Sequence, residues 1–301
     1  MILQLSHAGS FRAKGYVLAV VGSMFWGASG IAGQFLLQNR GVSPEWFASS
    51  RMILAGLILL AYDAACYKGD IFSIWRDKRE AVRLLIFSVV GMLGVQYTYF
   101  TAIHLSNAPT ATIIQYTMPI LILFWDSLTG RHLPGRRQCL CVGLAIMGTF
   151  LIVTQGRWGT LSVSPQALTW GLLSSVAAAF YTVQPKGLIR RWRSSLVVGW
   201  GMLTGGIAFS PVSRPWIFVG YFDTAAVLAF AFVVVFGTAV AFWLYLSSVE
   251  YISPGEASLL NSVEPLSSIV LSMLIFGMTF GAAEGLGAAL IIGTVLMVTK
   301  K

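Results

Sequence analysis

The sequence predicts an all-α integral membrane protein with ten transmembrane helices, arranged as a five-plus-five inverted repeat around a central cavity. Three observations predict this class: a scarcity of charge, apolar blocks of uniform length, and a likeness between the two halves. Of 301 residues, 56% are apolar and only 10% are Asp, Glu, Lys or Arg, whereas about a quarter of an ordinary soluble domain is charged. The apolar blocks are about twenty residues long, which is enough for a helix to cross a hydrocarbon core of ~30 Å.

The apolar blocks, separated by proline, glycine and charged residues, predict five spans in each half of the chain. The first five are expected near residues 16–37, 46–67, 82–103, 108–128 and 137–154. The second five are expected near residues 166–185, 196–212, 224–247, 255–276 and 282–299. The chain accordingly divides into a first repeat, residues 1–155, and a second repeat, residues 156–301.

The net charge of +9 reflects membrane topology, because the cations lie in short loops between apolar blocks. No nucleic-acid partner is expected, since that function needs a basic face on a folded domain. With ten spans and a cytoplasmic N-terminus, the inside segments hold every Lys and Arg except Arg40, Arg51, Arg157 and Arg214. This bias predicts that both termini are cytoplasmic. The first residues show no cleavable leader, so the first span should direct insertion.

Residues that carry chemistry are sparse. We expect Cys66, Cys139 and Cys141 to be reduced packing residues, because no nearby His or further Cys completes a tetrahedral metal site. The three histidines lie near the N-terminus or the ends of spans, and the chain has no phosphate-binding loop. The sequence therefore predicts no metal, no cofactor and no catalytic residues.

The two halves resemble each other most clearly at their ends. The segment MGTFLIVT (147–154) matches IGTVLMVT (292–299). Upstream, residues 97–119 align with residues 243–265 and keep the chemical type at most positions. Chance likeness between apolar helices is the alternative explanation. Five spans per half place the second half in the opposite orientation, which is the inverted-repeat architecture of secondary transporters and the basis for alternating access.

Two prolines occupy matching positions in the middle of the fourth and ninth spans. Pro119 and Pro265 cannot donate to the carbonyls of Gln115 and Asn261, four residues earlier. An unpaired carbonyl at membrane depth is tolerated where protein or a water-filled cavity satisfies it. The two breaks therefore predict a central cavity, with the Gln115 and Asn261 side chains as candidate substrate ligands. A simple packing kink is the alternative for each proline.

Glu264 is the most informative single residue. It lies about nine residues into the ninth span, roughly 13 Å deep at ~1.5 Å per residue. A carboxylate at that depth is a candidate functional group by default, able to bind a substrate ammonium group or to exchange a proton. The alternative is a structural acid paired with a helix hydroxyl or with Arg51. For Arg51, snorkelling to the headgroups is favoured over binding a substrate carboxylate.

Five aromatic residues are predicted to lie deeper than an interfacial belt and to line the cavity. Aromatic faces and phenol hydroxyls suit an amphipathic ligand with an ammonium group. The five are Trp26, Tyr97, Tyr116, Tyr181 and Trp243. Small residues supply a second pattern, because Gly22, Gly27, Gly30 and Gly33 in the first span and the Gly201-x-x-x-Gly205 motif in the seventh would allow close helix packing.

The ten spans, the repeat, the paired prolines and the closing GTFLIVT and GTVLMVT segments resemble the drug/metabolite transporter superfamily, and within it the EamA-like members. The chain looks most like the bacterial YddG-type amino acid exporters. The resemblance covers nearly the whole chain and implies a basket of helices around a cavity lined by the five aromatic residues named above. One departure from the family pattern is Met118, which stands where relatives often place an aromatic residue before the proline.

We therefore expect a transporter of the bacterial inner membrane that exports neutral or aromatic amino acids from the cytoplasm by alternating access. The expected partners are a small-molecule substrate and the lipid bilayer, and the protein is expected to be a monomer. Efflux of another small metabolite or a drug is the alternative within the same class. An integral-membrane enzyme is the alternative from a different class, and the sparse chemistry argues against it.

Overall fold

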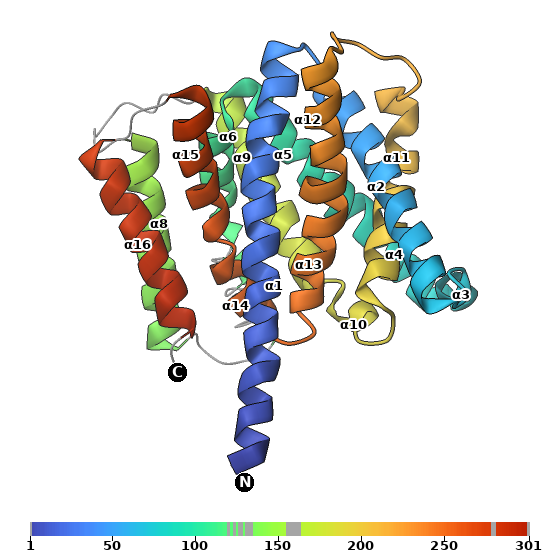
Figure 1. Cartoon of the computed structure of the whole chain (residues 1–301), viewed down its shortest axis with the longest axis horizontal. Helices are drawn as coiled ribbons and strands as arrows, with labels where there is room; N and C mark the ends of the chain where they lie inside the picture. Colours follow the sequence, from blue (N-terminus) through green and yellow to red (C-terminus); the bar gives the residue numbers. More distant parts are fainter. Residues whose placement is uncertain are drawn as a thin grey trace.

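The chain folds into a bundle of helices, some of them long and apolar enough to cross a membrane (Figure 1). The computed structural model describes residues 2–118, 135–154, 164–277 and 281–299, together with Leu121, Ile122, Trp125 and Thr129. Within these residues, six helical segments meet the length and hydropathy of a membrane span. They are Arg12–Asn39, Pro44–Tyr67, Lys78–Leu105, Ser194–Ser213, Thr224–Ser248 and Pro254–Ile275.

The helices of the first half agree with the predicted spans to within a few residues, except that α1 begins at Ile2, well before the predicted start at residue 16. They are α1 (Ile2–Gln34), η1 (Phe35–Asn39), α2 (Pro44–Tyr67), α3 (Ser73–Arg76), α4 (Lys78–Ile86), η2 (Phe87–Leu93), α5 (Gly94–Leu105), α6 (Ala108–Gln115) and α8 (Arg136–Thr154). The fourth predicted span, 108–128, is represented by α6, and most of its remainder lies outside the described residues.

The helices of the second half also follow the predicted spans. They are α9 (Pro165–Val183), α10 (Lys186–Ile189), α11 (Ser194–Ser213), α12 (Thr224–Val234), η3 (Val235–Val240), α13 (Ala241–Ser248), α14 (Pro254–Leu260), α15 (Val263–Phe276) and α16 (Ala282–Thr299). The prediction of an all-helical membrane protein is confirmed. A ten-helix inverted repeat stays a prediction.

Local sequence signals explain where several helices begin. The side chains of Ser43, Ser164 and Ser253 each accept a hydrogen bond from a backbone N–H of the first turn, and a proline follows each serine. Proline suits that position because its missing N–H would have no helical partner there. Asp77 and Asp223 cap α4 and α12 in the same way. These caps place the loops between apolar helices at the two ends of the bundle.

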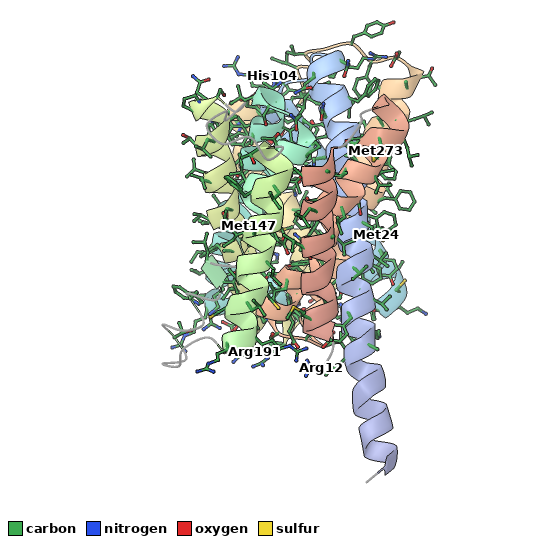
Figure 2. All side chains as sticks on the ribbon, turned by 90° about the vertical axis from the view of Figure 1, so that its left-hand side faces the viewer. Arg12, Met24, His104, Met147, Arg191 and Met273 are labelled. Atoms are coloured by element: carbon green, nitrogen blue, oxygen red, sulfur yellow. The ribbon has the colours of Figure 1, made fainter. Side chains whose placement is uncertain are left out.

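The described helices run between two opposite ends of the bundle, and α1 passes along its middle in the view of Figure 1. The start of α1, the end of α16, α3 and α10 lie at one end, which we call the terminal end. Figure 2 shows Arg12 and Arg191 at this end and His104 at the other.

Glycines let helices from the two halves approach closely, as the small-residue pattern predicted. A Cβ added at Gly56 of α2 would lie 2.6 Å from the backbone nitrogen of Leu203 in α11. A Cβ at Gly205 would lie 2.6 Å from the backbone oxygen of Ser88. On α1, a Cβ at Gly27 would lie 2.6 Å from the backbone oxygen of Glu264 in α15. These contacts fix the helices that surround the candidate site.

Candidate functional site

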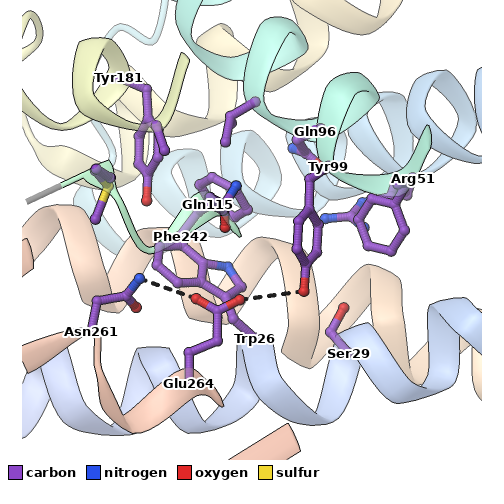
Figure 3. A pocket seen from close by; sticks show the side chains of 14 residues that line it. Trp26, Ser29, Arg51, Gln96, Tyr99, Gln115, Tyr181, Phe242, Asn261 and Glu264 are labelled. Atoms are coloured by element: carbon purple, nitrogen blue, oxygen red, sulfur yellow. Dashed lines mark hydrogen bonds between the residues drawn. The ribbon is translucent and has the colours of Figure 1, made fainter. Parts of the chain in front are cut away.

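A small cavity lined by both polar and aromatic side chains lies in the interior of the bundle, between α1, α2, α5, α6, α9, α13 and the α14–α15 segment (Figure 3). Its volume is about 30 Å³, which holds one or two water molecules. Except for Gln115, each lining side chain is more than nine-tenths buried. We call this space the central cavity; it is lined by Trp26, Ser29, Arg51, Val95, Gln96, Tyr99, Phe100, Gln115, Met118, Ala178, Tyr181, Phe242, Asn261 and Glu264.

Glu264 forms an acidic pole on one wall of the central cavity. The Nδ2 of Asn261 donates to its Oε2 at 3.1 Å, and the hydroxyl of Tyr99 donates to its Oε1 at 3.4 Å (Figure 3). Asn261 is itself held by Ser23 Oγ, which donates to its Oδ1 at 2.7 Å. The salt bridges of the described residues do not include one between Glu264 and Arg51. The carboxyl group is therefore anchored by neutral donors, and the ion pairs of the described residues do not include it.

The helix break at Asn261 brings this pole into the cavity. α14 ends at Leu260, Asn261 and Ser262 form a turn, and α15 begins at Val263. The break was predicted from Pro265, which lies buried in α15. The detail of a freed Asn261 carbonyl was wrong, because the Glu264 backbone N–H donates to that carbonyl at 2.9 Å. The chain thus satisfies its own backbone and leaves the Asn261 side chain for the cavity.

The fourth predicted span shows a comparable break. α6 ends at Gln115, and Tyr116 and Thr117 form a turn. The Nε2 of Gln115 donates to Ser174 Oγ of α9 at 2.5 Å, and this side chain lines the central cavity. Pro119, the predicted cause of the break, lies outside the described residues. Two amides from matching sequence positions thus reach one cavity.

Aromatic side chains form a second part of the cavity wall, next to the Glu264 carboxylate. Trp26 meets Phe242 and Tyr181 edge to face, with ring centroids 4.7 and 6.2 Å apart. The indole Nε1 of Trp26 is buried without a hydrogen-bond partner among the described residues. Edge-to-face contacts hold such rings in fixed orientations. The wall therefore offers an apolar surface with one free donor.

The structure brings some of the predicted aromatic residues to the central cavity and places others elsewhere. Trp26 and Tyr181 line it. Tyr116 is buried beside it, and its hydroxyl donates to the Leu259 carbonyl at 3.0 Å, which ties α6 to the end of α14. Tyr97 instead donates to Glu45 at 3.1 Å. Trp243 lines a separate cavity of about 500 Å³ near the terminal end.

Arg51 is the residue that sequence reasoning misplaced. The favoured expectation of snorkelling to the headgroups was wrong, because the side chain is only 2% exposed and lines the central cavity. Gln96, Tyr99, Phe100 and Phe242 were not predicted. The first three occupy one helical face at spacings of three and four residues, and this periodicity could have identified them.

Ion pairs between the two halves lie at both ends of the bundle. At the end opposite the termini, Arg40 binds Asp223 with 2.7 Å between Nη2 and Oδ2. Arg40 and then the Ala226 backbone N–H lower the pKa of Asp223 below its ordinary value. At the terminal end, Arg193 binds Asp63 at 2.5 Å, and Ser195 donates to the same carboxylate at 2.6 Å.

Two further ion pairs at the terminal end also join the two halves of the chain. Arg191 binds Glu80 at 2.8 Å, and Arg12 binds Glu256. Each of these pairs joins a residue of the first half to a residue of the second. The central cavity is thus bounded at both ends by links that a relative motion of the halves would have to break.

A buried cavity lined by polar and aromatic side chains, inside a bundle of membrane-length helices, is the arrangement expected of a multi-pass membrane transporter. The model of the EamA-like transporter family matches residues 13–154 and again residues 166–300. The chain therefore belongs to this family.

Relatives of the chain carry transporter names. It is 39% identical to the uncharacterized inner membrane transporter YicL of Salmonella typhimurium, over 97% of this chain and 96% of the relative. It is 24% identical to the uncharacterized transporter YetK of Bacillus subtilis, over all of this chain and 89% of the relative. A solved crystal structure superposes with a TM-score of 0.76 at 15% identity, over 95% of this chain and 97% of that one. That similarity concerns the fold alone.

Proposed function

We propose that this protein exports neutral or aromatic amino acids from the cytoplasm across a bacterial inner membrane through the central cavity. The observation that carries the proposal is the composition of the cavity wall, where the Glu264 carboxylate faces Trp26, Tyr181 and Phe242. An anionic pole attracts an ammonium group, and the adjoining rings suit an apolar side chain. Membership of the EamA-like family and the names of its relatives support transport across the inner membrane.

Alternating access between two five-helix halves is the proposed mechanism. The family model matches each half separately, and the aligned amides Gln115 and Asn261 meet at one cavity. The π-helical turns add to this likeness. When the alignment that pairs residue 97 with residue 243 is extended towards the N-terminus, η2 (Phe87–Leu93) pairs with residues 233–239. These residues overlap η3 (Val235–Val240). π-Helical turns often mark functional segments.

The conformation described here fits the closed stage of such a cycle. A cavity of about 30 Å³ is far smaller than the roughly 300 Å³ or more of typical ligand pockets. Substrate entry therefore requires separation of the helices around it, and the ion pairs at one end must break first. The cationic residues of α1, α4 and α10 at the terminal end support a cytoplasmic location for both termini.

Efflux from proteoliposomes tests the proposal. Purified protein is reconstituted with labelled phenylalanine, threonine or methionine inside, and efflux is followed with and without a pH gradient. We expect saturable, protein-dependent efflux of at least one of the three. Glu264→Gln should abolish it, whereas the matched change Asp70→Asn on the exposed loop should leave it unchanged.

The pH gradient separates two versions of the mechanism. Efflux that ignores the gradient indicates facilitated diffusion. Efflux that follows the gradient in wild type and is lost in Glu264→Gln indicates that this carboxylate carries the coupled proton. Folded protein that moves none of the three amino acids would refute the amino-acid proposal, and flux of a cationic drug instead would favour the alternative substrate class.

A further inference from the structure

Arg51 presents a buried cation that forms no ion pair with an anionic side chain of the described residues. Its side chain is 2% exposed, and its Nε and Nη1 atoms have no hydrogen-bond partner among the described residues. The Cζ atom lies 4.3 Å from the ring centroid of Phe100 and 5.4 Å from that of Phe47. Aromatic faces attract a guanidinium weakly and supply no acceptor for its N–H groups. A charged group at membrane depth is retained when something pairs with it during function.

Gln96 is a second buried side chain of this cavity whose polar atoms lack hydrogen-bond partners among the described residues. It is 2% exposed, and neither its Oε1 nor its Nε2 has a partner among the described residues. Both side chains line the central cavity. Buried polar groups in folded proteins are nearly always hydrogen-bonded, so adjacent orphaned donors indicate a ligand that is not present. An anion that accepts several hydrogen bonds would satisfy the Arg51 N–H groups and the Gln96 Nε2.

The two poles of the cavity lie on opposite sides of Tyr99. Figure 3 shows Tyr99 between the Glu264 carboxylate and the Arg51 guanidinium. The Tyr99 hydroxyl contacts Glu264 Oε1 at 3.4 Å and Thr112 Oγ1 at 2.7 Å, which keeps it on the acidic side. Gly30 makes this position possible, because a Cβ there would lie 2.9 Å from the hydroxyl oxygen. A negative wall and a positive wall therefore face one small space.

We infer that Arg51 and Gln96 bind the carboxylate of the substrate while Glu264 and Asn261 bind its ammonium group. The transported solutes are therefore zwitterions that carry both charges, and molecules with only one charged group are rejected. This inference rests on the proposed function and specifies its substrate class. The guanidinium can engage both carboxylate oxygens, which suits the planar geometry of that group. Tyr99 separates the poles in the closed state and lies where the substrate backbone would pass between them.

Competition with matched analogues tests this assignment. The amino acid with the largest flux competes against its own amide, which lacks the negative charge, and its des-amino acid, which lacks the positive charge. In wild type, only the zwitterion should compete well. In Arg51→Gln, the apparent affinity for the amino acid should fall about ten- to hundredfold, the range of one charge-assisted hydrogen-bonded pair. The amide should then compete as well as the amino acid does.

The complementary variants make the result specific. Because Glu264→Gln is expected to lose efflux, its ligand discrimination is measured as ligand-induced thermal stabilisation in detergent, where the des-amino acid should stabilise this variant about as well as the amino acid does. In the competition assay, Arg51→Lys should show an intermediate loss, since lysine keeps the charge without the planar fork. Gln96→Met, which retains size, should weaken amino-acid binding without removing selectivity for the zwitterion. Arg79→Gln, on an exposed surface, is the matched control.

Each outcome has one meaning. Folded Arg51→Gln protein with wild-type affinity and unchanged rejection of the amide would overturn this inference and leave the proposed function intact. Equal loss of amino acid, amide and des-amino acid in both Arg51→Gln and Gln96→Met would also overturn it, because it would assign these residues to packing. Absence of any amino-acid flux in wild type would overturn both proposals.

Discussion

Replacement of Gly27 by alanine tests how closely α1 must pack against α15. The added Cβ would lie 2.6 Å from the backbone oxygen of Glu264, 2.7 Å from Ser267 Cβ and 3.1 Å from the backbone nitrogen of Ser268. Two of these three atoms belong to the backbone, so a side-chain rotation cannot relieve the overlap. The segment that carries Glu264 must therefore move away from α1.

The structure sets the size of this movement. Ordinary contact begins near 3.4 Å, so the closest pair requires about 0.8 Å of separation, 3.4 less 2.6. Such overpacking costs roughly 1–3 kcal/mol. The better helix propensity of alanine offsets roughly 0.5–1 kcal/mol of that cost. The displacement also pulls Glu264 away from the Tyr99 hydroxyl, a contact that is already 3.4 Å long.

Thermal unfolding in detergent and efflux from proteoliposomes measure the two consequences. We expect Gly27→Ala to lower the unfolding midpoint by a few degrees, since 1 kcal/mol corresponds to about 2–4 °C in chains of 150–250 residues. We expect efflux to fall further than stability does, because the moved residue is a proposed ligand. The control is Gly143→Ala in α8, where no atom of the described residues lies within 4 Å of the added Cβ. That variant should be as stable as wild type or slightly more stable.

A Gly27→Ala protein with the stability and transport of wild type would refute the reasoning, because it would show that the close α1–α15 contact does not constrain the site. A parallel loss in Gly143→Ala would also refute it. The effect would then come from substituting any helical glycine in the bundle.

The ion pairs at the two ends supply the remaining predictions. Arg40 and the Ala226 N–H lower the pKa of Asp223, so the ionised carboxylate stabilises the fold fully above its unfolded pKa of about 3.9 and loses this effect as pH falls through the lowered folded value. Asp223→Asn should keep the helix cap and remove this pH dependence, so its unfolding midpoint should differ most from wild type near pH 7, and the difference should shrink as the pH falls below about 3.9. At the other end, Arg193→Gln should cost about 3–5 kcal/mol because it leaves the fully buried Asp63 without its cation, and adding Asp63→Asn should recover most of that loss in thermal unfolding. Equal midpoints for the single and double variants would contradict this account.

Sequence patterns located the elements of this protein well because membrane helices obey a simple physical constraint. Each span must satisfy its backbone internally over a fixed thickness of hydrocarbon, so length and apolarity alone mark it. The same constraint made Glu264, Asn261 and Gln115 recognisable as polar groups at depth, and all three line the central cavity. The break before Pro265 was also predictable, because proline removes a backbone donor wherever it stands.

Helix facing was harder to predict than depth. Tyr97 and Trp243 were chosen for their depth, but the cavity is lined by their neighbours Gln96 and Phe242. One residue along an α-helix is a rotation of about 100°. The π-helical turns η2 and η3 precede these positions, and each such turn shifts the facing of the residues that follow. No residue type in the sequence marks such a turn.

The sequence by itself determined the class of protein, the position of most spans and the acidic pole of the site, because these depend on local composition and on the cost of charge in hydrocarbon. Only the tertiary structure decided that Arg51 turns inward. Its position near a predicted span end suited a snorkelling side chain, but the folded bundle buries it between the rings of Phe47 on its own helix and Phe100 on α5. The second pole of the cavity arises from packing between distant segments, which no local pattern along the chain encodes.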